Sequence, residues 1–205
     1  MNKIKIAILG AGGHAKVVAS TAIAAGYDVV GFYADDPPKM GTLILGIPVN
    51  ELKDLDPAEC PNAIIAIGQN NVREKLSQEL DFNWISMVHP YSWVHPDVPI
   101  GEGTVICAGS IVQPGAKIGS HVIINTKSSV DHDTTVGNYS HISVAHLAGG
   151  GSVDEGVFMA LHSVVLPNIH VGAWAIVGAG SVVTKNVEAR TTVVGIPARV
   201  RKIKN

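Results

Sequence analysis

The sequence predicts an α/β domain with a small Rossmann-like parallel sheet over residues 1–88, followed by a left-handed parallel β-helix over residues 89–205 that ends in a C-terminal arm. Two observations predict this fold class. Short apolar runs alternate with helix-like runs up to about residue 87, which is the order of a parallel sheet with helices on its faces. Branched apolar residues then recur at every sixth position, a period that neither a single helix nor a single strand has.

The first domain begins with "KIKIAILG", a short apolar run that ends in glycine, as a buried parallel strand does. "GAGGHAKVVASTAIAAG" then opens as a glycine loop and continues as an alanine-rich helix that stops at Gly26. "DVVGFYADD" and "NAIIAIGQN" read as the second and third strands, joined by a loop. "NVREKLSQEL" follows as a polar-faced helix, and "NWISMVH" is predicted to be the fourth strand.

The six-residue period runs without a miss from Val94 to Ile142, slips by one residue, and resumes from Leu147 to Val183. Small or turn-forming residues follow the branched one, as in "IGEG", "IGSH", "VGNY" and "VGAW". Three hexads make one triangular turn whose branched side chains stack inside, so the sixteen in-phase positions predict roughly five turns of β-helix. The tail "VVGIPARVRKIKN" leaves the repeat and is expected to form a short strand or arm.

The composition excludes several classes of function. With 46% hydrophobic and 16% charged residues, the chain can bury a sizeable core. The net charge is −2 and basic residues gather only in the terminal "ARVRKIKN", so nucleic acid is not expected as the main partner. No apolar run is long enough for a membrane span and none has the form of a signal peptide, which predicts a cytoplasmic protein. Cys60 and Cys107 match no metal or disulfide spacing.

The loop Gly10–Ala15 fits the pattern G-x-G-x-x-[GA] between a strand and a helix. Glycines permit a close backbone approach and a helix N-terminus favours an anion, so Gly12, Gly13 and His14 are candidates for binding a phosphorylated ligand. The same pattern often marks a dinucleotide site. The domain is too short for both mononucleotide halves of such a fold, however, so a single nucleotide fits better.

Three more residues are expected at the same carboxyl edge of the sheet. Asp35 and Asp36 end the second strand, where a carboxylate can accept hydrogen bonds from a base or a ribose. Ordinary turn chemistry is the alternative for this acidic pair, because two prolines follow it. Gly68 follows the third strand, where open α/β sheets bind their ligands.

His132 lies between Asp131 and Asp133 in the segment "SSVDHDTTVGNYSHISV". Neutral imidazole is suited to accept a proton from a reacting nucleophile, because its pKa lies near the working pH. An adjacent carboxylate can orient the ring and stabilise the imidazolium as it forms. Successive residues of an extended segment point opposite ways, so either acid can be that partner. The alternative is a histidine at a corner of the β-helix without a catalytic role.

The chain resembles the sugar-nucleotide acyltransferases of the hexapeptide-repeat superfamily over nearly its whole length. The branch contains bacterial amino-sugar N-acetyltransferases and sialic acid O-acetyltransferase-like proteins. The parts that carry the resemblance are "GGHAK", "YADD", "AIGQNNVR", "NTKSSVDHD", "SHISV" and "GIPARV".

The resemblance implies a homotrimer, with acetyl-CoA bound between adjacent β-helices and a nucleotide sugar held between the N-terminal domain and a neighbouring β-helix. It assigns the general base to His132 and its acidic partner to Asp133. It assigns contacts with acetyl-CoA to four further residues: His141, Gly149, Leu161 and Ala179. No metal is expected, because none of the nine histidines belongs to a cluster with metal-ligand spacing.

Two features depart from the family pattern. The step from Ile142 to Leu147 is five residues where the repeat has six, which shortens one corner beside the expected acceptor site. Alanine occupies position 179, near which the family usually has glycine.

The resemblance therefore predicts an acetyl-CoA-dependent N-acetyltransferase of a nucleotide-linked amino sugar, of the UDP-4-amino-4,6-dideoxyhexose type, in bacterial glycan biosynthesis. UDP, GDP and dTDP all remain open as the nucleotide. Alternatives are O-acetylation of a sugar such as sialic acid, and a non-catalytic β-helix that binds a nucleotide sugar. A gamma-class carbonic anhydrase also has a hexapeptide β-helix, but it needs three zinc-binding histidines and leaves the glycine loop unexplained.

Overall fold

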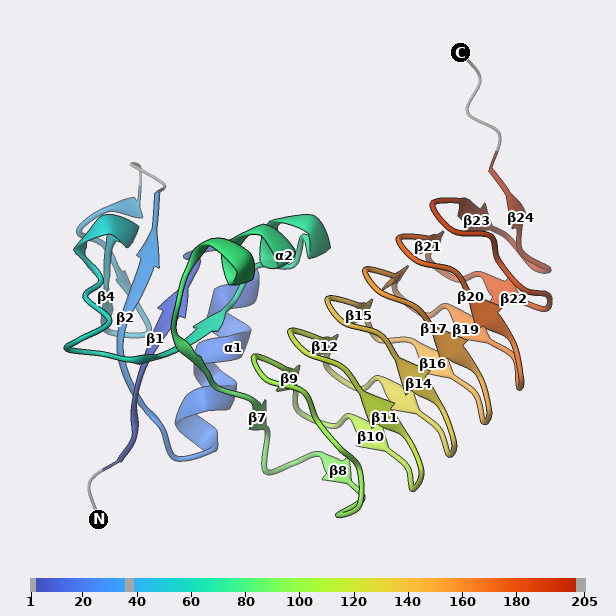
Figure 1. Cartoon of the computed structure of the whole chain (residues 1–205), viewed down its shortest axis with the longest axis horizontal. Coiled ribbons are helices and arrows are strands. Elements are labelled where there is room, and N and C mark those ends of the chain that lie inside the picture. The colour runs from blue at the N-terminus through green and yellow to red at the C-terminus, as the bar shows by residue number, and fades with distance from the viewer. Residues whose placement is uncertain (1–2, 36–38, 202–205) are drawn as a thin grey trace.

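The computed structural model describes residues 3–35 and 39–201, which form an α/β domain and a parallel β-helix (Figure 1). The α/β domain contains β1 (Lys5–Leu9), α1 (Gly13–Ala24), β2 (Asp28–Ala34), β3 (Leu43–Ile44), β4 (Ile47–Glu51), a 3₁₀ turn (Leu52–Asp54), β5 (Asn62–Ile65), α2 (Asn70–Glu79) and β6 (Asn83–Trp84).

The sheet of this domain has the strand order β3-β4-β2-β1-β5-β6. All neighbours pair in parallel except β3, which runs antiparallel to β4. The apolar runs form its centre because both faces of β1 and β5 are covered: Ile6, Ile8, Leu9, Ile64 and Ile65 are at most 1% exposed.

Two details differ from the sequence prediction. The expected loop after β2 contains the hairpin β3–β4, whose turn places Leu45 and Gly46 at φ 52° and 77°. A leucine at a positive φ is unusual, so the sequence carried little signal for this turn. The expected fourth strand is divided: β6 joins the α/β sheet, whereas Met87–Val88 forms β7 and pairs with β9 of the β-helix.

The β-helix has three flat sides. Face 1 consists of β7 (Met87–Val88), β9 (Val105–Ile106), β12 (Ile123–Ile124), β15 (His141–Ile142), β18 (Phe158–Met159), β21 (Ile176–Val177) and β23 (Thr192–Val194), with β24 (Arg199–Val200) antiparallel at its end. Face 2 consists of β8 (Trp93–Val94), β10 (Ile111–Val112), β13 (Ser129–Val130), β16 (His146–Leu147), β19 (Val164–Val165) and β22 (Val182–Val183). Face 3 consists of β11 (Lys117–Ile118), β14 (Thr135–Val136), β17 (Ser152–Val153) and β20 (His170–Val171).

The predicted repeat positions stack in register. On face 2, Val94 pairs with Val112 and Val112 with Val130, one coil of 18 residues apart. The next partner of Val130 is Leu147, 17 residues on, because the corner at Val144 is one residue shorter and holds φ at +50°. The slip in the period is therefore absorbed at a corner, and the stack continues unbroken. Fourteen of the sixteen repeat side chains are buried, and the other two, in the first coil, pack against the same core.

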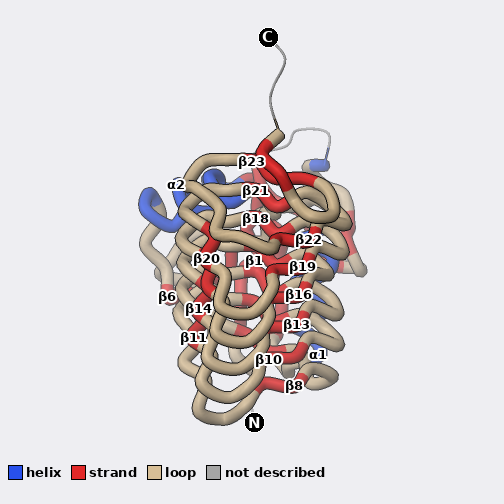
Figure 2. Tube along the Cα trace, turned by 90° about the vertical axis from the view of Figure 1, so that its right-hand side faces the viewer, coloured by secondary structure: helices blue, strands red, loops and turns tan. Residues whose placement is uncertain are grey.

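The α/β domain lies on face 1. Helix α1 shares a buried cluster with the outward side chains Met87, Val105 and Ile123 of that face. Faces 2 and 3 turn away from the domain: Figure 2 looks onto the corner between them, with β1 behind the β-helix. The corner between faces 2 and 3 therefore points away from the α/β domain, which covers face 1.

Candidate functional site

The glycine loop joins β1 to α1 at the carboxyl edge of the sheet. Gly10 has φ +115°, and a Cβ there would stand 3.0 Å from the side chain of Ile67 and 3.1 Å from the carbonyl oxygen of Ala66. Gly12 is the N-cap of α1, and a Cβ added at Gly12 or Gly13 would meet nothing within 4 Å. The space beside these two glycines is therefore open to a ligand, and the helix dipole favours a phosphate at this end of α1.

Asp35 and Gly68 lie at the same edge as the glycine loop. Asp35 follows β2 and is exposed, and Gly68 lies in the loop between β5 and α2. Because β2 and β5 flank β1, the ends of the three strands meet at one edge, where open α/β sheets bind nucleotides. Asp36, the other predicted acid, lies outside the described residues.

His141, on β15, is 7% exposed and uses both ring nitrogens. Its Nδ1 lies 3.3 Å from the carbonyl oxygen of Gly68, and its Nε2 lies 3.0 Å from Nδ2 of Asn125. The backbone N–H of Thr126 donates to Oδ1 of Asn125 over 2.8 Å, so the amide presents its NH₂ group to the ring. His141 therefore carries its proton on Nδ1, and its Nε2 lone pair is occupied.

His14, in the first turn of α1, lies beside His141 with the ring centroids 6.0 Å apart. Burial first, and the charge of Arg73 second, lower the pKa of His14 to about 4 and that of His141 to about 3. Both imidazoles are therefore neutral near pH 7. The structure thus joins His14 and Gly68, predicted to bind the nucleotide sugar, to His141, predicted to contact acetyl-CoA.

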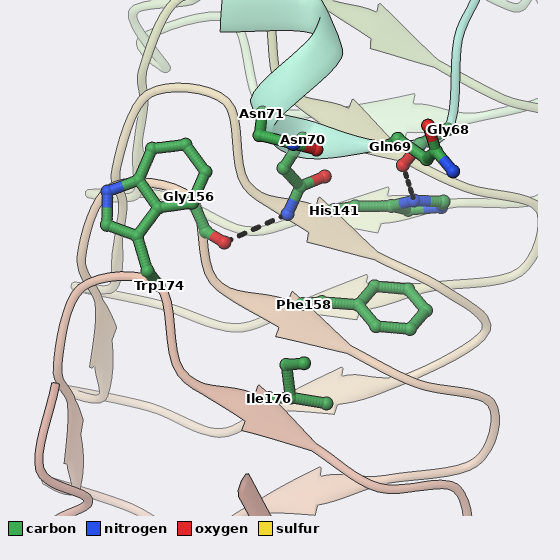
Figure 3. A pocket seen from close by; sticks show the side chains of 9 residues that line it. All are labelled: Gly68, Gln69, Asn70, Asn71, His141, Gly156, Phe158, Trp174 and Ile176. Atoms are coloured by element: carbon green, nitrogen blue, oxygen red, sulfur yellow. Dashed lines mark hydrogen bonds between the residues drawn. The ribbon is translucent and has the colours of Figure 1, made fainter. Parts of the chain in front are cut away.

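A cavity of about 490 Å³ continues from His141 between the start of α2 and face 1 (Figure 3). It has an apolar side, made by Phe158, Ile176 and the indole of Trp174, which lies against Gly156. Its other side is the segment 68–71, whose amide side chains can both donate and accept hydrogen bonds. Among the residues that the structure describes, no charged side chain lines the cavity, which suits a neutral polar ring such as a sugar.

Sequence reasoning missed one residue that shapes this region. Helix α2 was expected to be polar on its surface, yet the residue of α2 that is buried is Arg73. The motif "AIGQNNVR" contains it, but nothing in the sequence distinguishes this arginine from a solvated one.

His132 follows β13 at the corner between faces 2 and 3. Its Nδ1 lies 2.9 Å from Oδ2 of Asp133, while Oδ1 of Asp131 accepts the backbone N–H of His132 over 2.8 Å. The structure therefore places Asp133 on the ring and Asp131 on the backbone. The hydrogen bond to Asp133 first, and the charge of Asp131 second, raise the pKa of the exposed His132. With Nδ1–H donated to Asp133, Nε2 holds a free lone pair.

The remaining predicted residues lie on both edges of face 2. Gly149 is at the same corner as His132, one coil later, and its backbone packs against that imidazole. Leu161 and Ala179 are exposed at the opposite edge, between faces 1 and 2. One chain alone does not bring all four predicted acetyl-CoA contacts together, nor His132 to the cavity beside His141.

Known proteins are similar to this chain in both of its domains. Residues 5–80 match the family described as the PglD N-terminal domain. PerB from Caulobacter crescentus, solved with CoA and GDP-perosamine, is 34% identical over 97% of both chains, with a TM-score of 0.90. The chain belongs to the hexapeptide-repeat sugar-nucleotide acetyltransferases. The predicted fold class, a small parallel α/β sheet followed by a left-handed β-helix, is thereby confirmed.

Two further relatives match this chain, one with lower identity and one over a smaller share of it. The acetyltransferase domain of PglB from Neisseria gonorrhoeae is 31% identical, with a TM-score of 0.89 over 97% of this chain and 100% of that domain. Serine acetyltransferase from Buchnera aphidicola is 34% identical over 111 residues, which are 52% of this chain. The chain spans 37% of the length of that curated relative.

Within residues 3–35 and 39–201, no helix has the length and apolar character needed to cross a bilayer. Over the same part of the chain, no three His, Cys, Asp or Glu side chains converge in a way that could hold a metal ion.

Proposed function

We propose that this protein is an N-acetyltransferase that moves the acetyl group of acetyl-CoA to the amino group of a nucleotide-linked amino sugar. The observation that carries the proposal is the exposed His132–Asp133 pair, with Nδ1 and Oδ2 2.9 Å apart and Nε2 free. The likeness to PerB over 97% of both chains supports the substrate class, because PerB was solved with CoA and GDP-perosamine.

In the proposed reaction the acceptor amine attacks the thioester carbonyl of acetyl-CoA. A C–N bond forms, the C–S bond breaks, and the sulfur leaves as the CoA thiolate, which then takes up a proton. His132 removes a proton from the attacking nitrogen through Nε2. Asp133 holds the proton of Nδ1, which keeps the reactive tautomer in place and stabilises the imidazolium that forms.

His141 is the other histidine that sequence reasoning placed near the chemistry, and its geometry argues against the role of base. Its Nε2 accepts the amide of Asn125, its Nδ1 donates to Gly68, and burial keeps it uncharged. We propose that His141, with His14 and Gly68, instead forms a wall of the acceptor site. In this proposal Gly12 and Gly13 receive the diphosphate, and Asp35 and Asp36 bind the nucleoside.

His132 points away from face 1, so the proposed site needs a second chain. We propose a homotrimer in which His132, Asp133 and Gly149 of one chain meet the His141 side of a neighbour. Acetyl-CoA would lie between the two β-helices, against Gly149 of one and Leu161 and Ala179 of the other. We place the enzyme in the cytoplasm, where acetyl-CoA and nucleotide sugars are both available.

An acceptor panel tests the proposal. Purified protein is given acetyl-CoA with UDP-, GDP- and dTDP-linked 4-amino-4,6-dideoxyhexoses, with the matching 4-hydroxy sugars, and with sialic acid, while free thiol is followed. We expect release only with the amino sugars and highest kcat/KM for one nucleotide, UDP being the expectation from sequence. Turnover of sialic acid or of the hydroxy sugars alone would overturn N-acetylation.

Sedimentation and subunit mixing test the trimer. We expect a trimer at micromolar concentration. His132→Ala protein mixed with Gly13→Trp protein should regain activity that neither has alone, since some mixed sites receive an intact half from each chain. A monomer by sedimentation, or mixing without recovery after proven subunit exchange, would contradict a site shared between chains.

A further inference from the structure

Arg73 is 1% exposed and lies beneath the start of α2, against the β-helix. Its guanidinium makes no ion pair with a carboxylate anywhere in the described residues. Burying an unpaired cation costs free energy, and an apolar side chain of similar volume would fill the space without that cost. The presence of arginine here points to a role beyond packing.

The hydrogen bonds of Arg73 connect two parts of the protein. On the β-helix, Nε donates to the carbonyl of His121 over 2.9 Å, and Nη2 donates to the carbonyl of Tyr139. On the loop before α2, Nη1 donates to the carbonyl of Ile67, and at the first residue of α2, Nη2 donates to Oδ1 of Asn70, both over 2.9 Å. A planar fork of five donors suits such carbonyls on several sides at once, which an ammonium group does not.

Asn70 extends the connection by one coil. Its Nδ2 donates to the carbonyl of Gly156 over 2.9 Å (Figure 3) and to the carbonyl of Val157 over 3.2 Å. His121, Tyr139 and Gly156 occupy the same corner, between faces 3 and 1, in three successive coils. Arg73 and Asn70 together therefore tie the loop 67–70 to three stacked corners.

The tied loop carries the carbonyl of Gly68 between its two anchored ends. That carbonyl is the partner of Nδ1 of His141, at 3.3 Å. If the loop moved off the β-helix, His141 would lose the acceptor that holds its proton on Nδ1. The proton could then move to Nε2, which would no longer serve only as the acceptor of the hydrogen bond from the Asn125 amide.

We propose that Arg73 is a positioning residue for the acceptor site: it holds the loop 67–70 on the β-helix so that Gly68 fixes the tautomer and orientation of His141. The proposal rests on the proposed function, in which His141 and Gly68 form one wall of the sugar-nucleotide site. Arg73 acts through Ile67 and Asn70 and does not itself touch the substrate.

Arg73→Lys tests the proposal, because lysine keeps the charge and loses the fork. We expect the KM for the nucleotide sugar to rise by about tenfold or more, as expected when a hydrogen bond to a charged group is lost, with the KM for acetyl-CoA unchanged. In ¹⁵N NMR spectra, wild-type His141 should show a single tautomer, with Nδ1 protonated and Nε2 unprotonated. The variant should show a mixture of the two neutral tautomers. Lys75→Met, on the exposed side of the same helix, is the matched control and should change neither readout.

Asn70→Ala is the second variant, in case Arg73→Lys does not fold. It removes the bonds to Gly156 and Val157 and should shift both readouts in the same direction by less. A folded Arg73→Lys protein with a wild-type His141 spectrum, or with both KM values unchanged, would make Arg73 a purely structural residue. The NMR measurement needs no turnover, so it decides this question even if no acceptor in the panel is acetylated.

Discussion

Gly149 lies against the imidazole of His132, so closely that a Cβ on Gly149 would stand 2.5 Å from Nε2 and 2.7 Å from Cε1. The backbone N–H of Gly150 donates to the carbonyl of His132 over 3.0 Å, which holds the two corners together. The missing side chain at position 149 therefore leaves the Nε2 edge of His132 accessible to an acceptor nitrogen.

Gly149→Ala should lower kcat by about tenfold or more while leaving the midpoint of thermal unfolding nearly unchanged, because the methyl group displaces an exposed and movable ring from its position. The same substitution in a His132→Ala background should cause little further loss. Additive losses in this double-mutant cycle would mean that Gly149 acts on acetyl-CoA and not through the histidine.

His132→Ala should reduce kcat by roughly 100- to 10,000-fold, the usual contribution of a positioned general base, with both KM values near wild type. Folding should be unaffected, since the side chain is exposed. Raising the pH should restore part of the rate, because more of the acceptor amine is then neutral.

His95 offers a matched control for that experiment. It pairs with Asp97 at the same corner between faces 2 and 3, two coils earlier, so His95→Ala removes another histidine–aspartate pair from a place without a proposed function. Near-normal turnover of a folded His132→Ala trimer would overturn the assignment of the base. Complete loss on His141→Ala with unchanged KM values would transfer it to His141.

Asp133→Asn should cost less than loss of the histidine and should shift the pH profile. The hydrogen bond to Asp133 is the main cause that raises the pKa of His132, so its removal lowers that pKa. The acid limb of the kcat/KM profile should then move to lower pH while the plateau falls. Asp131→Asn is the comparison: its carboxylate binds the backbone, so the plateau should be preserved. If the acid limb does not move in Asp133→Asn, the group that titrates in the profile is not one whose pKa depends on Asp133.

Gly13→Ala should raise the KM for the nucleotide sugar and spare that for acetyl-CoA. The new Cβ meets nothing within 4 Å, and alanine favours a helix by up to about 1 kcal/mol over glycine, so stability should be kept or improved. A rise in KM would then mean that the methyl group obstructs the approach of the nucleotide sugar to the loop. If the KM for acetyl-CoA rises instead, the two substrate sites have been exchanged.

Acid should destabilise the protein below about pH 6.5. Burial is the main cause that lowers the pKa of His14 and His121 to about 4 and that of His141 to about 3, whereas each is about 6.5 when unfolded. Between pH 6.5 and about 4 the unfolded chain binds more protons, so the free energy of unfolding falls as the pH is lowered through that window. Denaturant titrations at several pH values should show this slope, and His121→Asn should reduce it. An equal slope in the variant would assign the acid sensitivity to other groups.

The β-helix was predictable because each coil repeats the same sequence pattern. A branched side chain at every sixth position has one place to be buried, and the slip after Ile142 shortens a corner without disturbing the stack. The hairpin around Leu45 was not predictable, since its turn forces a leucine into a conformation that sequence patterns assign to glycine or asparagine.

The candidate site was predictable only in parts. The flanking acids singled out His132, but the sequence left Asp131 and Asp133 equivalent, and only the fold of the corner places Asp133 on the ring. The meeting of His141 with Gly68, 73 residues apart, depends on how the α/β domain docks on face 1. Arg73 was missed for the same reason, because its partners are backbone carbonyls, which every residue has.

The reversed direction of β24 has a consequence for solubility. A parallel solenoid grows by adding identical rungs, so an uncovered last rung would present a ready template to another molecule and invite fibre growth. Beyond β23 the chain turns back, and Val193 and Val194 pair with Val200 and Arg199 in the antiparallel sense. On face 1, a rung arriving in the parallel sense therefore meets a strand of the wrong polarity, and the chain's own final strand closes this side of the column.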